Sequence, residues 1–204
     1  MRRQTKVGVG PRRTYAIHSN LLESDSVNKL ICFDITSLQQ VEIFADLIVD
    51  STDNKNLFLK YQNNDPLSDV SFPTKDFVKT ATELQRMDEL WKSTCFELFL
   101  NVIGQNQYYE FNFSLDGFWN CYHFQGYRFP QPATASTDFE IESMKWSNNL
   151  LEISLRNFSN YMQFNVGLTA VINDKKNQIN YYALKHESGK PDFHVKTSFI
   201  LQRG

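Results

Sequence analysis

The most chemically informative part of the chain is a pair of short segments in which carboxylates and amides alternate with aromatic residues. The segment 95–101 carries Glu97, and the segment 108–114 carries Glu110 and Asn112. Carboxylate oxygens accept hydrogen bonds from hydroxyl groups, and an asparagine amide both donates and accepts them. Together with an aromatic wall, such side chains can bind a small polar ligand.

Two other interpretations of these residues remain open. Paired carboxylates such as Glu97 and Glu110 also carry out glycoside hydrolysis, and Cys121 with His123 could act as a nucleophile and its base. The structural alternative is that the glutamates are solvated on an outer sheet face and that Cys121 is a small buried residue. We favour a non-catalytic binding module over an enzyme, because the sequence shows no pocket around these groups.

Turn residues predict how three strands bring these side chains together. A short polar loop separates the first two strands and pairs Asn101 with Glu110. The dipeptide Asp116-Gly117 is typical of a two-residue type I′ hairpin, and a turn centred there pairs Asn112 with Cys121. Because side chains alternate between the faces of a strand and paired residues share a face, this register assigns every residue of the three strands to a face.

One of the two predicted faces is apolar and the other is polar. The polar face has no lysine or arginine, which a solvated outer face normally carries. The apolar face, expected to form the core, contains Phe96, Leu98, Leu100, Tyr109, Phe111, Phe113, Tyr122 and Phe124, with Asn120 as its polar member. The polar face contains Cys95, Glu97, Phe99, Asn101, Glu110, Asn112, Ser114, Trp119, Cys121 and His123.

The chain as a whole reads as an all-β protein. It has 204 residues with 17 Phe and 9 Tyr, and short aromatic or alternating runs are separated by turn residues. Roughly ten such runs predict one antiparallel β-sandwich over residues 14–204, with little helix beyond a turn or two near 79–87 and with a last strand at 195–201. Residues 1–13 are expected to form a flexible basic lead-in.

Charge and cysteine content exclude several classes of protein. The formal net charge is -2, so no excess of positive charge indicates nucleic-acid binding. The basic start of the chain is followed by Gly, Pro and Arg rather than by an apolar stretch, and no apolar run is long enough for a membrane helix. Three cysteines without metal-ligand spacing do not suggest a disulfide framework. We therefore expect a cytoplasmic protein.

Several strings in the chain resemble the DOMON-like domain proteins of bacteria. They are LWKSTCFELFL at 90–100, YYEFNFS at 108–114, GFWNCY at 117–122, YALKH at 182–186 and GKPDFH at 189–194. The wider superfamily includes family 9 carbohydrate-binding modules and haem-binding cytochrome domains. The resemblance implies an antiparallel sandwich that holds its ligand on or beside a sheet.

The resemblance also implies a set of sugar contacts. In the sugar-binding relatives a tryptophan stacks on the sugar, and a glutamate six residues later grips its hydroxyl groups together with polar residues of the next strand. This chain has no second tryptophan in its C-terminal part, so Tyr181 or Tyr182 would complete the sandwich around the sugar. The full set of expected ligand-binding residues is Trp91, Glu97, Glu110, Asn112, Trp119, His123, Tyr181, Tyr182 and His186.

Neither a cofactor nor a metal is predicted. A haem- or other redox-cofactor-binding domain of the DOMON type stays open as an alternative, although no Met lies at a diagnostic spacing from a His here and methionines more often fill the core. Structural calcium is also a weak alternative, since the chain has no calcium-loop motif. The turn at 189–194 is either a loop fixed by Pro191 or part of the rim of the binding site.

Overall fold

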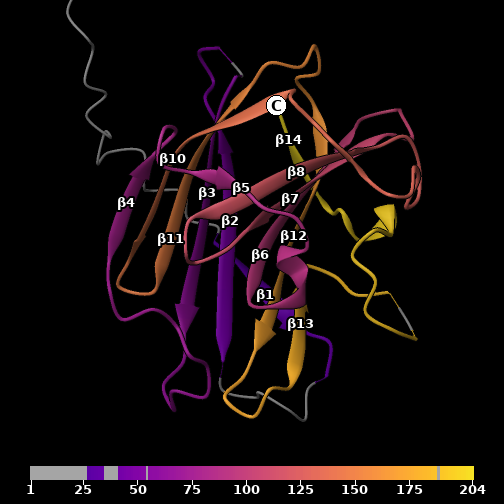
Figure 1. Ribbon diagram of the computed structural model, residues 1–204. Coiled ribbons are helices and arrows are strands. Elements are labelled where there is room, and N and C mark those ends of the chain that lie inside the picture. Colours follow the sequence, from indigo (N-terminus) through magenta and orange to yellow (C-terminus); the bar gives the residue numbers. More distant parts are fainter. Residues whose placement is uncertain (1–26, 35–40, 54, 188) are drawn as a thin grey trace, which may run out of the picture.

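The regular secondary structure of the described residues is almost entirely β-strand. The structure, a computed structural model, describes residues 27–34, 41–53, 55–187 and 189–204. Within these residues fourteen strands are hydrogen-bonded into one continuous, curled sheet (Figure 1). The predicted all-β antiparallel fold with little helix is confirmed, and the number of strands exceeds the ten expected. The predicted lead-in at 1–13 lies outside the described residues.

The strands fall into two groups on opposite sides of the molecule (Figure 1). The first group is β1 (Asn28–Cys32), β2 (Glu42–Val49), β3 (Asn56–Asn64), β4 (Phe77–Thr80), β10 (Phe139–Ser147) and β11 (Leu150–Asn157). The second group is β5 (Gln85–Arg86), β6 (Cys95–Val102), β7 (Tyr108–Phe113), β8 (Phe118–Phe124), β9 (Thr134–Ala135), β12 (Phe164–Asn173), β13 (Ile179–Ala183) and β14 (Leu201–Arg203).

The predicted sandwich of two separate sheets is not confirmed, because the described strands are connected in one path. The order of the sheet is β4-β10-β11-β3-β2-β1-β13-β12-β6-β7-β8-β5, with β14 beside β12 and β9 beside β8. Strand β1 joins the groups, because Lys29 pairs with Phe44 of β2 and Cys32 pairs with Tyr182 of β13. All named pairs are antiparallel except β5 with β8.

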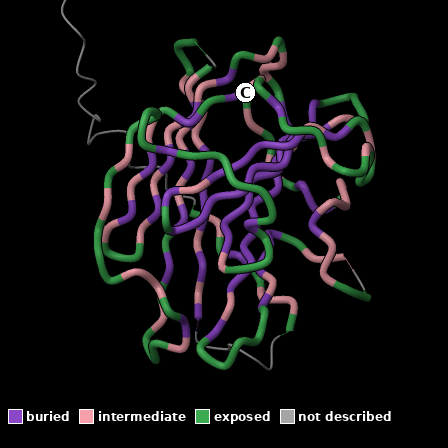
Figure 2. The backbone as a smooth tube through the Cα atoms, in the orientation of Figure 1, coloured by how far each residue is buried: buried purple, intermediate pink, exposed green. Residues whose placement is uncertain are grey.

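Curling brings the inner faces of the two groups together around a shared core. The ring of Tyr61 on β3 lies 5.0 Å from that of Phe96 on β6, and Phe139 on β10 lies 5.0 Å from Phe111 on β7. The buried residues of Figure 2 concentrate along β6, β7 and β12. Strand β6 is buried on both faces, which means that something other than the core also covers its outer face.

The first hairpin differs from its predicted register by two residues. Glu97 pairs with Asn112, Phe99 with Glu110, and Asn101 with Tyr108. The loop is longer than predicted, because the Asn101 amide donates to the backbone oxygens of Gln105 and Gln107, at 3.0 and 2.8 Å. A shift of two residues leaves each side chain on its predicted face, so the faces of β6 and β7 are confirmed.

The second hairpin differs by one residue, and that shift reverses the faces of β8. The turn is a three-residue loop in which Gly117 takes φ 81° and the backbone N–H of Ser114 donates to Phe118 O. The extra loop residue pairs Asn112 with Asn120 instead of Cys121. The predictions for β8 are therefore wrong. Trp119, Cys121 and His123 share the face of the core, and Asn120, Tyr122 and Phe124 share the face of Glu97 and Glu110.

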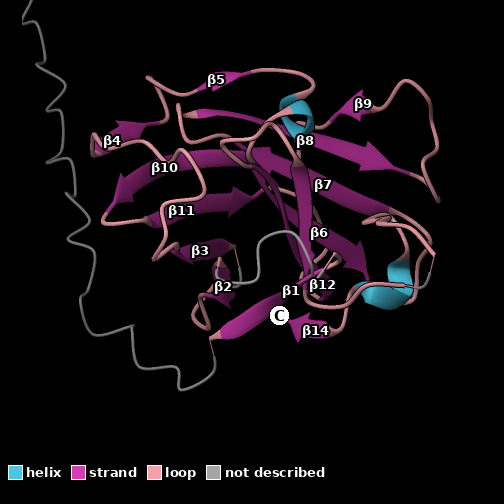
Figure 3. Cartoon of the chain, turned by 90° about the horizontal axis from the view of Figure 1, so that it is seen from below, coloured by secondary structure: helices cyan, strands magenta, loops and turns pink. Residues whose placement is uncertain are grey.

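In the described part of the chain, helix is limited to two short 3-10 turns, η1 (Leu90–Lys92) and η2 (Lys196–Ser198) (Figure 3). The helical turns predicted near 79–87 are wrong. Thr80 closes a tight turn through Glu83 between β4 and β5, with the backbone N–H of Thr80 donating to the carboxylate at 2.9 Å. The last strand is β14, later than predicted. No helix among the described residues is long and apolar enough to cross a membrane.

Candidate functional site

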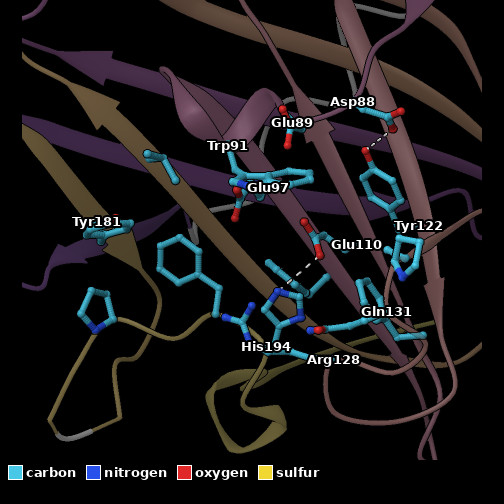
Figure 4. A pocket seen from close by; sticks show the side chains of 17 residues that line it. Asp88, Glu89, Trp91, Glu97, Glu110, Tyr122, Arg128, Gln131, Tyr181 and His194 are labelled. Atoms are coloured by element: carbon cyan, nitrogen blue, oxygen red, sulfur yellow. Dashed lines mark hydrogen bonds and ion pairs between the residues drawn. The ribbon is translucent and has the colours of Figure 1, made fainter.

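A pocket of about 1000 Å³ lies on the outer face of the second group of strands (Figure 4). Its floor is formed by β6, β7, β8, β12 and β13. Three segments outside the sheet form the walls: residues 88–91 at η1, residues 128–133 between β8 and β9, and residues 191–194 in the C-terminal loop. These walls explain why the outer face of β6 is buried.

Two glutamates from neighbouring strands form the polar part of the floor. Glu97 is 3% exposed and Glu110 is 5% exposed, although both line the pocket. Glu97 Oε2 accepts a hydrogen bond from the Thr169 hydroxyl at 3.0 Å, and Glu110 Oε1 accepts one from the Asn112 amide at 2.8 Å. Both hydrogen-bond donors are neutral, so neither compensates a carboxylate charge.

Burial makes both carboxyl groups hold their protons more tightly than usual. It raises the pKa of Glu110 to about 7, against the opposing effects of the Asn112 hydrogen bond and the Arg128 charge. Burial and the neighbouring charge of Glu110 raise the pKa of Glu97 well above its ordinary value. Glu110 can therefore exchange a proton with a ligand near neutral pH.

His194 closes the pocket above Glu110. Its Nε2 atom lies 3.5 Å from Glu110 Oε2 (Figure 4). Its Nδ1 atom lies 2.8 Å from the Tyr108 hydroxyl. Burial, together with the charge of Arg128, lowers the pKa of His194 to about 4. The imidazole is therefore neutral at pH values near 6, and its contact with Glu110 is then one between neutral groups.

Arg128 and the C-terminal loop are joined across the pocket mouth. The Arg128 guanidinium donates to Asp192 Oδ1 at 3.0 Å, and the backbone N–H of Arg128 donates to the Tyr108 hydroxyl at 3.1 Å. These contacts tie the loop between β8 and β9 to residues 191–194. The pocket wall thus depends on two segments that are about 64 residues apart in sequence.

Trp91 stands on the opposite wall with its ring 39% exposed. The segment before η1 is fixed to β8, because Asp88 accepts hydrogen bonds from the Tyr122 hydroxyl at 2.7 Å and from the Asn120 amide at 2.8 Å. Leu90 anchors η1 in the protein, while Trp91 remains outside with its ring edge-on to Tyr122 at 5.9 Å. An exposed ring on a fixed turn can pack against the apolar face of a ligand.

Four of the predicted ligand-binding residues line this one pocket: Trp91, Glu97, Glu110 and Tyr181. Asn112 does not line it but orients Glu110 from behind. The loop predicted as a possible rim also takes part, through Pro191, Phe193 and His194.

The other four predicted residues lie elsewhere. Trp119 and His123 are on the inner side of β8, where Trp119 packs under the Arg86 guanidinium and His123 stacks on Tyr109. Tyr182 points into the core, because it alternates with Tyr181 along β13. His186 hydrogen-bonds Ile31 O at 2.7 Å, outside the pocket lining.

Several lining residues were not among the predicted ligand contacts. Arg128, His194 and Asp88 reach the pocket from loops, whose positions do not follow from strand alternation. Tyr122 was assigned to the wrong face by the one-residue error in β8. A three-residue turn with glycine in its last position would have placed it correctly. Among the described residues no group of three or more His, Cys, Asp or Glu side chains is arranged to hold a metal ion.

Comparisons with known proteins give one informative result. No model of a known protein family matches the chain, and no curated protein is similar to it in sequence. A solved structure from Bacteroides uniformis, provisionally described as a carbohydrate-binding protein, superimposes with a TM-score of 0.54 at 11% identity. The match covers 87% of this chain and 84% of that one. At this identity the likeness shows a shared fold.

Proposed function

We propose that the protein binds a carbohydrate, without catalysis, in the pocket between Trp91 and His194. The observation that carries the proposal is the composition of this pocket, which combines an exposed indole on one wall with two buried carboxyl groups on the floor. A sugar presents an apolar C–H face and a rim of hydroxyl groups, and these two surfaces match the ring and the carboxyls respectively.

Two further observations support the proposal. The structural neighbour in Bacteroides uniformis is itself provisionally described as carbohydrate-binding and has the same fold. The pattern of Trp91 and Glu97 also resembles that of family 9 carbohydrate-binding modules, which belong to the wider superfamily of the DOMON-like proteins. In this assignment Tyr181 takes the place of a second tryptophan, while Gln131 supplies an amide from the loop after β8.

Calorimetric titration with a panel of mono- and oligosaccharides tests the proposal. We expect dissociation constants on the order of micromolar to millimolar, since each hydrogen bond to a sugar contributes only about 0.5–3 kcal/mol after desolvation. Trp91→Ala and Glu97→Gln should each weaken binding by about tenfold or more. The matched control is Phe158→Ala, which removes an aromatic ring that is 53% exposed and is not part of the pocket.

Two outcomes of the titrations would contradict carbohydrate binding in this pocket. Equal binding by wild type, Trp91→Ala and Glu97→Gln would place the sugar outside this pocket. No binding of any saccharide, with displacement of another small molecule from the pocket, would retain the site and overturn its assignment to carbohydrate.

Glycoside processing is a second candidate, favoured by one observation. The pair Glu97 and Glu110 shares a pocket, and a carboxyl group with a pKa near 7 is suited to act as a general acid. Release of nitrophenol from a panel of nitrophenyl glycosides, lost in both Glu97→Gln and Glu110→Gln, would support catalysis over binding alone.

A further inference from the structure

The two pocket glutamates lie on one face of the sheet, diagonal to each other on adjacent strands. Glu97 pairs with Asn112 and Glu110 pairs with Phe99, so the two carboxyl groups are offset by two residues along β6 and β7. Diagonal neighbours on one face lie within reach of a common group. A ligand atom resting on the pocket floor can therefore contact both.

The charge of the pocket lining is unbalanced when these carboxyls ionise. Four carboxyl side chains line the pocket, Asp88, Glu89, Glu97 and Glu110, against one guanidinium, that of Arg128. Arg128 is paired with Asp192 at 3.0 Å, and Glu89 is paired with Lys92 at 2.7 Å. Among the described residues no Lys or Arg forms an ion pair with Glu97 or Glu110, so their ionisation would give the floor a negative charge without a cationic partner.

One carboxyl oxygen on the floor is available to a ligand. Glu97 Oε2 accepts the hydrogen bond from the Thr169 hydroxyl, and among the described residues no hydrogen bond reaches Glu97 Oε1. Because Glu97 lines the pocket, a ligand can supply a donor to Oε1 (Figure 4).

Aromatic rings surround the carboxyl pair. Trp91, Tyr122, Tyr181 and Phe193 line the same pocket. The face of an aromatic ring can bind either a cation or an apolar C–H group, and surrounding rings exclude water from an ion pair.

We propose that the ligand is an amino sugar whose protonated amine is held by Glu97 and Glu110 while its ring packs on Trp91. The inference rests on the proposed function and specifies its substrate class. An ammonium group favours ionisation of the carboxyl pair, balances the charge that results, and supplies three donors, one of which reaches Glu97 Oε1. A neutral sugar supplies donors but no charge.

The proposal predicts that ligand binding releases a proton from Glu110. Because burial raises the pKa of Glu110 to about 7, the free protein carries a proton there at pH 6. An ammonium group bound beside the carboxyl favours its ionised form, so binding releases about one proton into solution. The other titratable groups that line the pocket or interact with the pair are Tyr61, Asp88, Glu89, Cys95, Tyr108, Cys121, Tyr122, Arg128, Tyr181, Asp192 and His194.

The test is calorimetric titration of the full chain at pH 6 with matched ligands. Glucosamine, galactosamine and mannosamine are each compared with the neutral parent hexose and with the N-acetyl derivative, and methylammonium serves as an amine without a ring. Repeating each titration in buffers of different ionisation enthalpy gives the number of protons released. We expect at least one amino sugar to bind about tenfold more tightly than both of its neutral counterparts, with release of about one proton.

Variants separate the charged contact from general damage to the pocket. In Glu97→Gln/Glu110→Gln the ratio of affinities for amino and neutral sugar should fall to near one and proton release should vanish. If that variant does not fold, the comparison between amine and N-acetyl ligands on wild type still decides the matter, because acetylation removes the charge and keeps the ring.

Three other outcomes would each contradict a different claim about the ligand. Neutral sugars that bind as tightly as amino sugars would overturn this inference and leave carbohydrate binding intact. Methylammonium that binds as tightly as any amino sugar would show that the ring contributes nothing, and it would overturn the assignment to a sugar. Absence of binding by every saccharide would overturn the proposed function as well.

Discussion

Buried Glu110 and partly buried His194 form a pair whose pKa values are shifted in opposite directions. Burial raises the pKa of Glu110 from 4.5 to about 7 and lowers that of His194 from 6.5 to about 4. Glu110 therefore stabilises the folded state most below pH 4.5 and loses that contribution as the pH rises to 7. His194 does the reverse, because its contribution is present above pH 6.5 and is lost as the pH falls toward 4.

Because the two pKa values shift in opposite directions, removing either group alone should change the pH dependence of the free energy of unfolding in opposite directions. Between pH 4.5 and 6.5 the pair holds one proton in the folded state and one in the unfolded state, so the two effects cancel in the wild type. Relative to wild type, Glu110→Gln should gain free energy of unfolding as the pH rises, by about 1.4 kcal/mol per pH unit, and His194→Gln should lose it at a similar rate.

Urea unfolding at several pH values between 4.5 and 6.5 checks this prediction. The double variant should again be parallel to wild type, since neither shifted group remains. Glu140→Gln, which replaces an exposed carboxylate on β10, is the matched control. Parallel curves for wild type and Glu110→Gln would show that the carboxyl is not shifted in the folded protein.

At the scale of elements, Gly167 on β12 makes room for the contact that supports the C-terminal wall. The ring of Phe199 stacks on Phe99 at 5.3 Å, and Phe99 in turn lies 5.5 Å from the ring of His194. A Cβ atom at position 167 would lie 2.5 Å from Phe199 Cδ1 and 3.3 Å from Phe99 Cβ. The absence of a side chain at Gly167 leaves room for Phe199. Phe199 packs on Phe99, and Phe99 in turn contacts His194.

Gly167→Ala should displace Phe199 and loosen the wall. We expect a loss of about 1–3 kcal/mol in the free energy of unfolding, as for other overpacked sites, with faster amide exchange in residues 193–199. Gly126→Ala is the control, because a Cβ atom there meets nothing within 4 Å. Amide exchange at 193–199 that is equal in both variants would show that Phe199 does not fix this segment.

At the scale of the whole molecule, stability depends on the core shared by the two groups of strands. Phe111 is 0% exposed, and its ring lies edge-on to Phe139 of the opposite group at 5.0 Å. The same strand carries Glu110 on its other face. The core and the pocket floor are therefore two sides of one strand.

Phe111→Ala should lower the free energy of unfolding by about 3–5 kcal/mol, because a buried ring is lost and the surrounding side chains refill its volume only in part. The urea midpoint measures the effect. Phe129→Ala, at a ring that is 59% exposed, should change the midpoint far less. A midpoint for Phe111→Ala equal to that of wild type would show that the faces of β7 are reversed.

The sequence by itself determined the all-β antiparallel class and the faces of β6 and β7, although not the number of strands. Alternation with period two is a local property, so Phe96 and Phe111 fall on the core side and Glu97 and Glu110 on the other, even though the predicted register was off by two residues. The resemblance to sugar-binding modules added Trp91, which stands just before β6.

Only the tertiary structure decided the rest of the site. The turn before β8 has one residue more than predicted, and a shift of one residue reverses the faces of a strand. Tyr122 and Phe124 therefore face the pocket, where Trp119 and His123 were expected. Arg128 and His194 arrive on loops whose paths depend on long-range contacts, such as that between Arg128 and Asp192. The shifted pKa values depend on burial under these loops, which strand alternation does not specify.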